Sequence, residues 1–103
     1  MADIQLIVKA IKETLNPEKI ILFGSYSRGE QTKDSDIDLA VIKKDKPELG
    51  EVANVYTKLR HLGYEWEVSP DIHLFAKKDF EERLKNNSFF ISEVAKGKVI
   101  YAN

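Results

Sequence analysis

The sequence contains no cysteine, a single tryptophan and no excess of charge of either sign. Without cysteine the chain can form neither a disulfide bond nor a thiolate metal site, which fits a reducing compartment. Sixteen basic residues nearly balance seventeen acidic ones, and the net charge is −1. This balance lacks the basic surface of proteins that bind nucleic acid directly, so any phosphate site has to be local.

Long apolar runs are also missing. No stretch approaches the roughly 20 apolar residues that span a membrane, and the N-terminal segment MADIQLIVKAIKETL lacks the uninterrupted apolar run of a signal peptide. We therefore expect a cytoplasmic protein without membrane association. A hydrophobic fraction of 43% in 103 residues suffices for one packed core. We expect a single domain over residues 1–103, with an open active site that a partner chain or an oligomer could complete.

Hydrophobic spacing predicts alternating helices and strands. Apolar residues at helical spacing predict helices over residues 4–15, 49–62, 79–85 and 88–97, and short apolar runs predict strands over residues 19–23, 36–42, 66–75 and 98–101. Asp3 and Ser88 are the expected helix N-caps, and residues 43–46 form an expected charged turn. Pro70 has no amide hydrogen, so the third strand should lie at a sheet edge or begin at this residue.

This order of elements predicts an α/β fold, in which helices pack on a small β-sheet. Only about a dozen residues connect the first two predicted strands, which is short for a crossover between parallel neighbours. The sheet should therefore be mixed rather than wholly parallel.

A possible anion site follows the first predicted strand. Gly24 ends the apolar run and would let a ligand approach the backbone closely, while Ser25 opens a polar turn. The amide groups of such a turn, together with the serine hydroxyl, can donate hydrogen bonds to a phosphate. On its own, a Gly-Ser pair after a strand is more often only a turn.

A pair of carboxylates begins the second predicted strand. Since strand side chains alternate, Asp36 and Asp38 should project from one face with their Cα atoms about 7 Å apart. Their mutual repulsion would be relieved by Mg²⁺, which binds one or two carboxylates together with substrate phosphates. An isolated Asp-x-Asp, however, is more often a solvated strand edge.

The two elements together carry a resemblance. The matching stretches are Leu22-Phe23-Gly24-Ser25-Tyr26-Ser27-Arg28-Gly29 and Ser35-Asp36-Ile37-Asp38-Leu39-Ala40-Val41. They resemble the DNA polymerase β-like nucleotidyltransferase superfamily, and more narrowly the minimal nucleotidyltransferases, or MntA-like family. The chain matches each fixed position of that pattern, and its length and element order agree. The resemblance implies a nucleotidyltransferase fold like the palm of polymerase β.

The resemblance also implies roles for individual residues. Asp36 and Asp38, with a third carboxylate on a later strand, would be catalytic and hold two Mg²⁺ ions. Asp71, which opens the apolar run of residues 70–75, is the best candidate for the third, and Glu67 is its competitor by position. Gly24 and Ser25 would bind the triphosphate. Arg28 belongs to the same signature, either as a phosphate or carboxylate partner or in a structural role.

The function implied is transfer of a nucleoside monophosphate, AMP from ATP, to a hydroxyl group. Similar chains are typically encoded beside a helical HEPN protein in toxin–antitoxin pairs, so the resemblance implies an antitoxin that modifies a tyrosine of a HEPN toxin. Two alternatives stay open: a small-molecule acceptor, and an inactive antitoxin that only binds its partner. The sequence leaves undetermined the acceptor, the base preference, the oligomeric state and any role of His73, which shares a strand face with Asp71.

Overall fold

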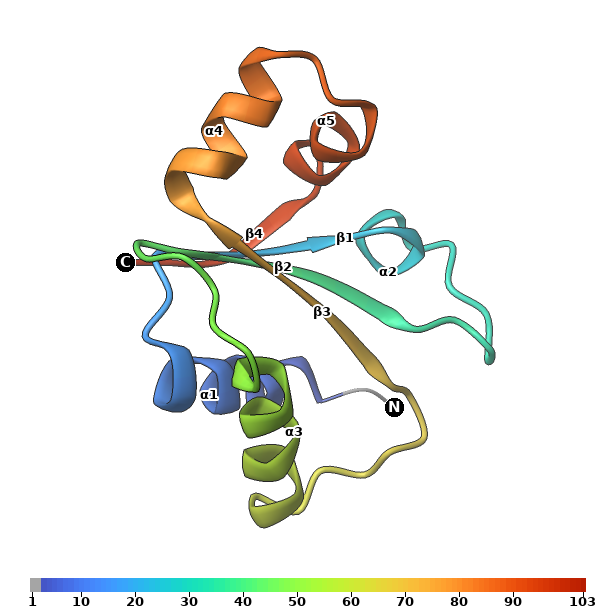
Figure 1. The fold of residues 1–103 in the computed structure, drawn as a ribbon. Helices are drawn as coiled ribbons and strands as arrows, with labels where there is room; N and C mark the ends of the chain where they lie inside the picture. The colour runs from blue at the N-terminus through green and yellow to red at the C-terminus, as the bar shows by residue number, and fades with distance from the viewer. Residues whose placement is uncertain (1–2) are drawn as a thin grey trace.

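The computed structural model describes residues 3–103, which form a four-stranded sheet with helices on both faces (Figure 1). The helices are α1 (Ile4–Leu15), α2 (Ser25–Arg28), α3 (Glu51–His61), α4 (Lys77–Lys85) and α5 (Phe89–Ala95). The strands are β1 (Lys19–Phe23), β2 (Ile37–Lys43), β3 (Pro70–Ala76) and β4 (Lys98–Ala102). The predicted order of four helices and four strands is confirmed, and α2 is a further short helix in the polar turn after β1.

The sheet is mixed, as its short first connection predicted. Its strand order is β3-β2-β1-β4. β1 pairs antiparallel with both β2 and β4, whereas β2 and β3 are parallel and are joined through α3. β3 begins at Pro70 and lies at the edge, so the missing amide hydrogen of the proline costs the ladder nothing.

Each face of the sheet is covered by a pair of helices. In Figure 1, α1 and α3 lie on one face, and α4 and α5 lie on the other. Alternate strand residues supply the two cores, because successive side chains point to opposite faces. The core under α1 and α3 includes Ile7, Ile11, Ile20, Leu39, Val41, Leu59 and Ile72, and the core under α4 and α5 includes Ile21, Phe23, Ala40, Phe75, Phe80 and Ile91.

Both predicted helix caps are confirmed. The Asp3 carboxylate accepts a hydrogen bond from the Leu6 amide at 3.0 Å, and the Ser88 hydroxyl accepts one from the Ile91 amide at 3.5 Å. These bonds satisfy amide groups that have no partner within the first helical turn. Among the described residues, no helix combines the length and apolar character needed to cross a membrane.

Two predicted boundaries are wrong. The strand expected from residue 66 begins only at Pro70, because residues 66–69 form a loop in which the Tyr64 hydroxyl donates to the Val68 carbonyl at 2.6 Å. The charged turn expected from residue 43 begins later, because Lys43 is the last residue of β2. Its side chain is buried and pairs with Glu51 at the start of α3, which removes the cost of an isolated buried charge.

One predicted core contribution is also wrong. Leu49 was expected in the apolar stripe of the second long helix but is fully exposed, because Gly50 adopts a left-handed conformation and α3 starts after it. Burial also differs among the first residues of α5. Ile91 is buried, but 81% of Phe89 is exposed because it opens a helix with only one face on the sheet.

The packing of α3 against α1 gives a test of the fold. Leu59 is completely buried between these helices and the sheet. Leu59→Ala should lower the free energy of unfolding by about 2–5 kcal/mol, because it removes buried methyl groups and leaves a cavity. Leu49→Ala, the same change at an exposed site, should cost less than about 0.5 kcal/mol. Urea denaturation measures both, and equal losses would contradict the assigned core.

Candidate active site

The residues singled out by the sequence lie together at one end of the sheet, where β1 ends and β2 and β3 begin. In the parallel ladder Asp38 lies opposite Asp71, and in the antiparallel ladder Asp38 lies opposite Phe23, the residue before Gly24. Gly24, Asp38 and Asp71 therefore form a row across three adjacent strands. The row starts at β1 and ends at β3, the edge strand.

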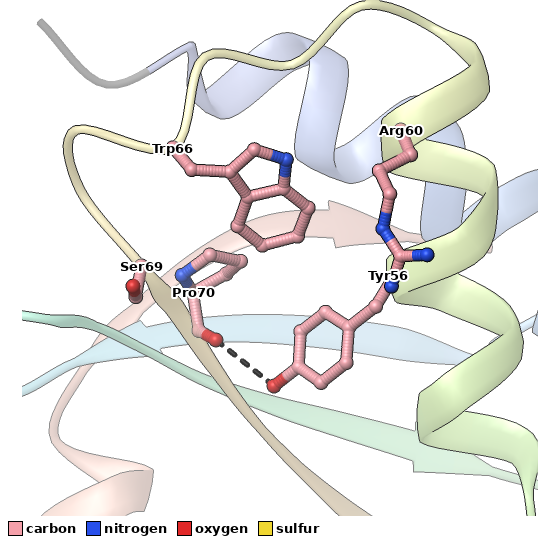
Figure 2. A pocket seen from close by; sticks show the side chains of 5 residues that line it. All are labelled: Tyr56, Arg60, Trp66, Ser69 and Pro70. Atoms are coloured by element: carbon pink, nitrogen blue, oxygen red, sulfur yellow. Dashed lines mark hydrogen bonds between the residues drawn. The ribbon is translucent and has the colours of Figure 1, made fainter.

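A pocket of about 570 Å³ lies beside the β3 end of this row (Figure 2). Tyr56 and Arg60 of α3 form one side of it, and Trp66, Ser69 and Pro70 form the other. The pocket is on the α3 side of the sheet. The side chains of the carboxylate row project toward the opposite side, as the alternation of β3 requires.

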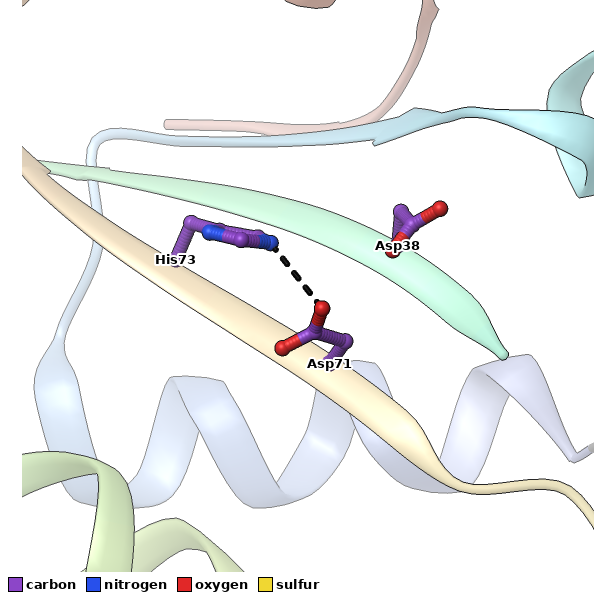
Figure 3. Close-up of side chains that lie close together, drawn as sticks. All are labelled: Asp38, Asp71 and His73. Carbon is purple, nitrogen blue, oxygen red and sulfur yellow. Dashed lines mark ion pairs between the residues drawn. The ribbon is translucent and has the colours of Figure 1, made fainter.

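Asp38, Asp71 and His73 form a compact group of side chains (Figure 3). One ligand atom from each of the three lies within 4.8 Å of the others. His73 Nε2 is 3.3 Å from a carboxylate oxygen of Asp71. Carboxylate oxygens suit Mg²⁺ and Mn²⁺, and an imidazole nitrogen extends the choice to other transition metals. The donor set thus fits a divalent cation.

Asp36 lies at the rim of this group rather than inside it. It precedes β2 by one residue and is exposed. Among the described residues, the compact group of ligand atoms consists of Asp38, Asp71 and His73. The charge of Asp36 nevertheless reaches the group, because it contributes to the raised pKa of Asp38. The structure therefore pairs Asp38 with Asp71 across two strands more closely than with its neighbour in sequence.

The Asp38 carboxyl is the electrostatically perturbed member of the row. Partial burial is the main cause that raises its pKa above the ordinary aspartate value, and the negative charge of Asp71 raises it further. The charge of Asp36 adds to this, while His73 acts in the opposite direction. Negative charge therefore predominates at the ionised site, and a divalent cation bound there would relieve the repulsion.

Gly24 lies directly against the side chain of Asp38. Its φ is +74°, and a Cβ atom at this position would lie 2.4 Å from a carboxylate oxygen of Asp38. The Ser27 hydroxyl donates to the Gly24 carbonyl at 2.7 Å, and the Ser27 amide donates to it at 3.1 Å, which fixes the turn. Ser25, at the start of α2, is half-buried. The sequence predicted that Gly24 would let a ligand approach the backbone closely. In the structure the group closest to Gly24 is the Asp38 carboxylate.

Arg28 and Glu67 lie outside the carboxylate group. The Arg28 guanidinium pairs with Glu30, and both side chains are exposed. Arg28 also lines a cavity of about 170 Å³ that includes Gly24. Glu67 lies in the loop before β3, whereas Asp71 is in register with Asp38. Of the two candidates for the third carboxylate, the geometry favours Asp71.

His73 is the site residue that the sequence left without a role. Its ring lies 5.6 Å from the ring of Phe23 and 5.7 Å from that of Phe90, measured between centroids. These contacts hold the imidazole beside Asp71. The available signal was strand alternation, which places residues 71 and 73 on the same face, but one sequence does not show what else lies on that face.

The contact between Gly24 and Asp38 gives a second test. Gly24→Ala should destabilise the fold more than Gly29→Ala, by about 1–3 kcal/mol, because the added methyl group displaces the Asp38 carboxylate. Gly29 is the matched control, since it also has a positive φ but nothing within 4 Å of an added Cβ. Asp38→Ala removes the two nearest clashing atoms and should recover most of the difference in a double-mutant cycle. Additive losses in urea denaturation would contradict the contact.

The raised pKa of Asp38 predicts a pH dependence. Between the unfolded and folded pKa values the folded state holds more protons, so stability falls as pH rises through this window. At pH 7 without metal, Asp38→Asn should therefore melt at a temperature equal to or above that of the wild type. The advantage should shrink as the pH falls toward the ordinary aspartate pKa. A melting temperature that drops at pH 7, in EDTA, would show that the ionised carboxylate is stabilising.

Comparisons with known sequences agree with this site. The family model described as Polymerase beta, Nucleotidyltransferase matches residues 5–103. Among curated proteins of Methanocaldococcus jannaschii, "Putative protein adenylyltransferase MJ0604" is 49% identical over 43 residues, which span 33% of this chain and 43% of that protein. "Putative protein adenylyltransferase MJ1547" is 31% identical over 94 residues, covering 68% of this chain and 77% of that protein.

Solved structures show the same fold. A chain in "Crystal structure of the toxin-antitoxin with AMP-PNP" matches with a TM-score of 0.66 at 24% identity, over 96% of this chain and 73% of that chain. A mutant of the toxin–antitoxin MntA-HpeT gives a TM-score of 0.67 at 22% identity, over 98% and 74%. Since the family model spans nearly all of the sequence, the chain belongs to the polymerase β nucleotidyltransferase family.

Proposed function

We propose that this chain transfers AMP from ATP to a tyrosine hydroxyl of a HEPN-type toxin and thereby acts as its antitoxin in the cytoplasm. The observation that carries the proposal is the row formed by Gly24, Asp38 and Asp71 across three strands. A turn that can bind phosphate stands at one end of the row and a carboxylate stands at the other. The reacting phosphorus would lie between them.

The β1 end of the row suits the departing phosphates. Gly24 has no side chain to obstruct a triphosphate, and the Ser25 hydroxyl has no hydrogen-bond partner among the described residues. Ser27, in contrast, uses its hydroxyl within the turn. Ser25 is therefore the hydroxyl available to donate to the β- or γ-phosphate. Arg28, three residues after Ser25, would also bind the phosphates if its guanidinium exchanged Glu30 for them.

The carboxylates would organise the transfer itself. Asp38 and Asp71, with Asp36 at the rim, would hold Mg²⁺, which when bound lowers the pKa of the acceptor hydroxyl and neutralises charge on the phosphates. The acceptor oxygen bonds to the α-phosphorus, the bond to the bridging oxygen breaks, and pyrophosphate leaves. Asp71 would accept the hydroxyl proton as general base, and His73 would hold it in position.

The proposed acceptor rests on the relatives. Curated relatives are named protein adenylyltransferases, and similar solved structures are named toxin–antitoxin complexes, one of them with AMP-PNP. The matched segment spans only 43% of MJ0604 and 33% of MJ1379, another relative from the same organism.

An AMP group on a tyrosine would add a bulky anion near the RNA-cleaving site of the toxin and block it.

Mass spectrometry tests the proposal. Incubation with the toxin encoded beside this chain, ATP and Mg²⁺ should add about 329 Da per AMP group, the mass expected for nucleotidyl transfer, and the addition should map to a tyrosine. The variant Asp36→Asn/Asp38→Asn should lose more than about 100-fold in rate, because it removes preorganised stabilisation of the transition state.

The variant Asp34→Asn/Asp45→Asn is the matched control, since it removes the same charge from two exposed positions outside the row and should retain activity. Transfer to a small molecule instead of the toxin would show that the acceptor is wrong. Full neutralisation of the toxin by Asp36→Asn/Asp38→Asn, without a mass change, would show that the chain acts by binding alone.

A further inference from the structure

The pocket beside β3 is already formed by contacts within the protein. The Tyr56 hydroxyl donates to the Pro70 carbonyl at 3.0 Å, which ties α3 to the start of β3 (Figure 2). The Trp66 ring meets the rings of Tyr56 and Tyr64 nearly edge-on, with centroids 5.9 Å and 5.1 Å apart. Arg60 projects from the last turn of α3 into the same space. The pocket thus combines fixed aromatic walls with one cation.

This pocket adjoins the β3 end of the carboxylate row. Pro70, one of its walls, directly precedes Asp71, so their Cα atoms are about 3.8 Å apart. The hydroxyl of Tyr56 lies close enough to the row that the charges of Asp71 and Asp36, after the larger effect of burial, help raise its pKa. The Asp71 side chain projects to the other face of the sheet, but β3 is the edge strand, so a peptide that occupies the pocket can continue around this strand toward Asp71.

The geometry of the transfer decides whether the pocket beside β3 suits the acceptor or the nucleotide. In nucleotidyl transfer the attacking and leaving oxygens lie roughly in line on opposite sides of the phosphorus. If the triphosphate lies against Gly24, pyrophosphate departs toward β1, and the acceptor has to approach from β3. The nucleoside branches away from this line. The pocket therefore lies beside the β3 end of the row, which is the end from which the acceptor arrives.

We propose that the pocket formed by Tyr56, Arg60, Trp66, Ser69 and Pro70 binds an acidic peptide segment of the acceptor protein, next to the hydroxyl that is modified. An aromatic or aliphatic side chain of that segment packs on Trp66 and Tyr56, as anchors at protein interfaces do. An acidic neighbour pairs with the Arg60 guanidinium. This inference rests on the proposed function, because it assigns the side of the site from which the acceptor approaches.

The single tryptophan of the chain reports on this pocket directly. The probe is the blocked tetrapeptide Tyr-Glu-Phe-Glu, titrated in buffer with Mg²⁺, and its control is the same peptide with lysine in place of each glutamate. The acidic peptide should change Trp66 fluorescence with a Kd of about 1 mM, as expected for a small contact. The basic peptide should bind more weakly, and AMP-PNP with Mg²⁺ alone should leave the emission unchanged.

Two variants assign the binding to the pocket. Arg60→Gln should weaken the acidic peptide about fivefold, the upper range for an exposed ion pair. Lys58→Gln removes the same charge from the same helix, but Lys58 pairs with Glu13 of α1 instead of lining the pocket, so it should leave peptide affinity unchanged. Equal effects of the two variants would overturn the role of Arg60.

The outcomes separate this inference from the proposed function, because the titration requires no catalysis. A fluorescence change with AMP-PNP alone would overturn the inference by making the pocket a nucleotide site, even if transfer to the toxin occurs. The inference would also be overturned if Trp66 fluorescence did not change with the acidic peptide up to about 10 mM, because weaker binding than this is negligible. Specific peptide binding by a chain without transferase activity would support the pocket and contradict the proposed function.

Discussion

The parallel pairing of β2 with β3 is the constraint on which the site depends. It places Asp38 directly opposite Asp71, and two carboxylates so close together repel each other. Partial burial of Asp38 increases this cost, as its raised pKa shows. The fold tolerates the arrangement because the two strands are fixed elsewhere, by side chains packed under helices on both faces. The two hydrophobic cores therefore stabilise the fold, and the repulsion between carboxylates is confined to one end of the sheet.

The connections between the strands explain why the site is at that end. A short link makes β1 antiparallel to β2, so β1 ends where β2 begins. The longer link through α3 makes β3 parallel to β2, so both begin at the same end. The Gly24 turn and the first residues of β2 and β3 consequently meet. α3 also contributes Tyr56 and Arg60 to the pocket beside β3, so the same connection shapes both the carboxylate row and this pocket.

Much of this could be predicted from the sequence. Hydrophobic spacing identified the four strands and every helix except the short, polar α2, the short first link predicted the mixed sheet, and Pro70 predicted the edge strand. These features depend on local patterns. Errors arose where long-range contacts decide: Lys43 is buried because Glu51 lies opposite it, and the loop of residues 66–69 replaces the start of a strand.

The site was predictable only in part for the same reason. Gly24, Asp38 and Asp71 were found because the motif and the strand positions point to them. Asp38 lies closer to Asp71 than to Asp36 because of the register between β2 and β3. One sequence does not reveal this register. The position of His73 between two phenylalanines depends on the packing of α5. Trp66 is an ordinary surface aromatic in the sequence, and only the tertiary structure places it in a pocket beside Asp71.

The central claim is that the row of Gly24, Asp38 and Asp71 binds a metal–triphosphate. Crystals grown with Mn²⁺ and AMP-PNP would test it most directly through the anomalous signal of the metal. We predict an anomalous peak coordinated by Asp38 and Asp71, with the β- and γ-phosphates against Gly24 and Ser25. A nucleotide bound elsewhere, or Mn²⁺ absent from these carboxylates while the nucleotide is bound, would contradict the account.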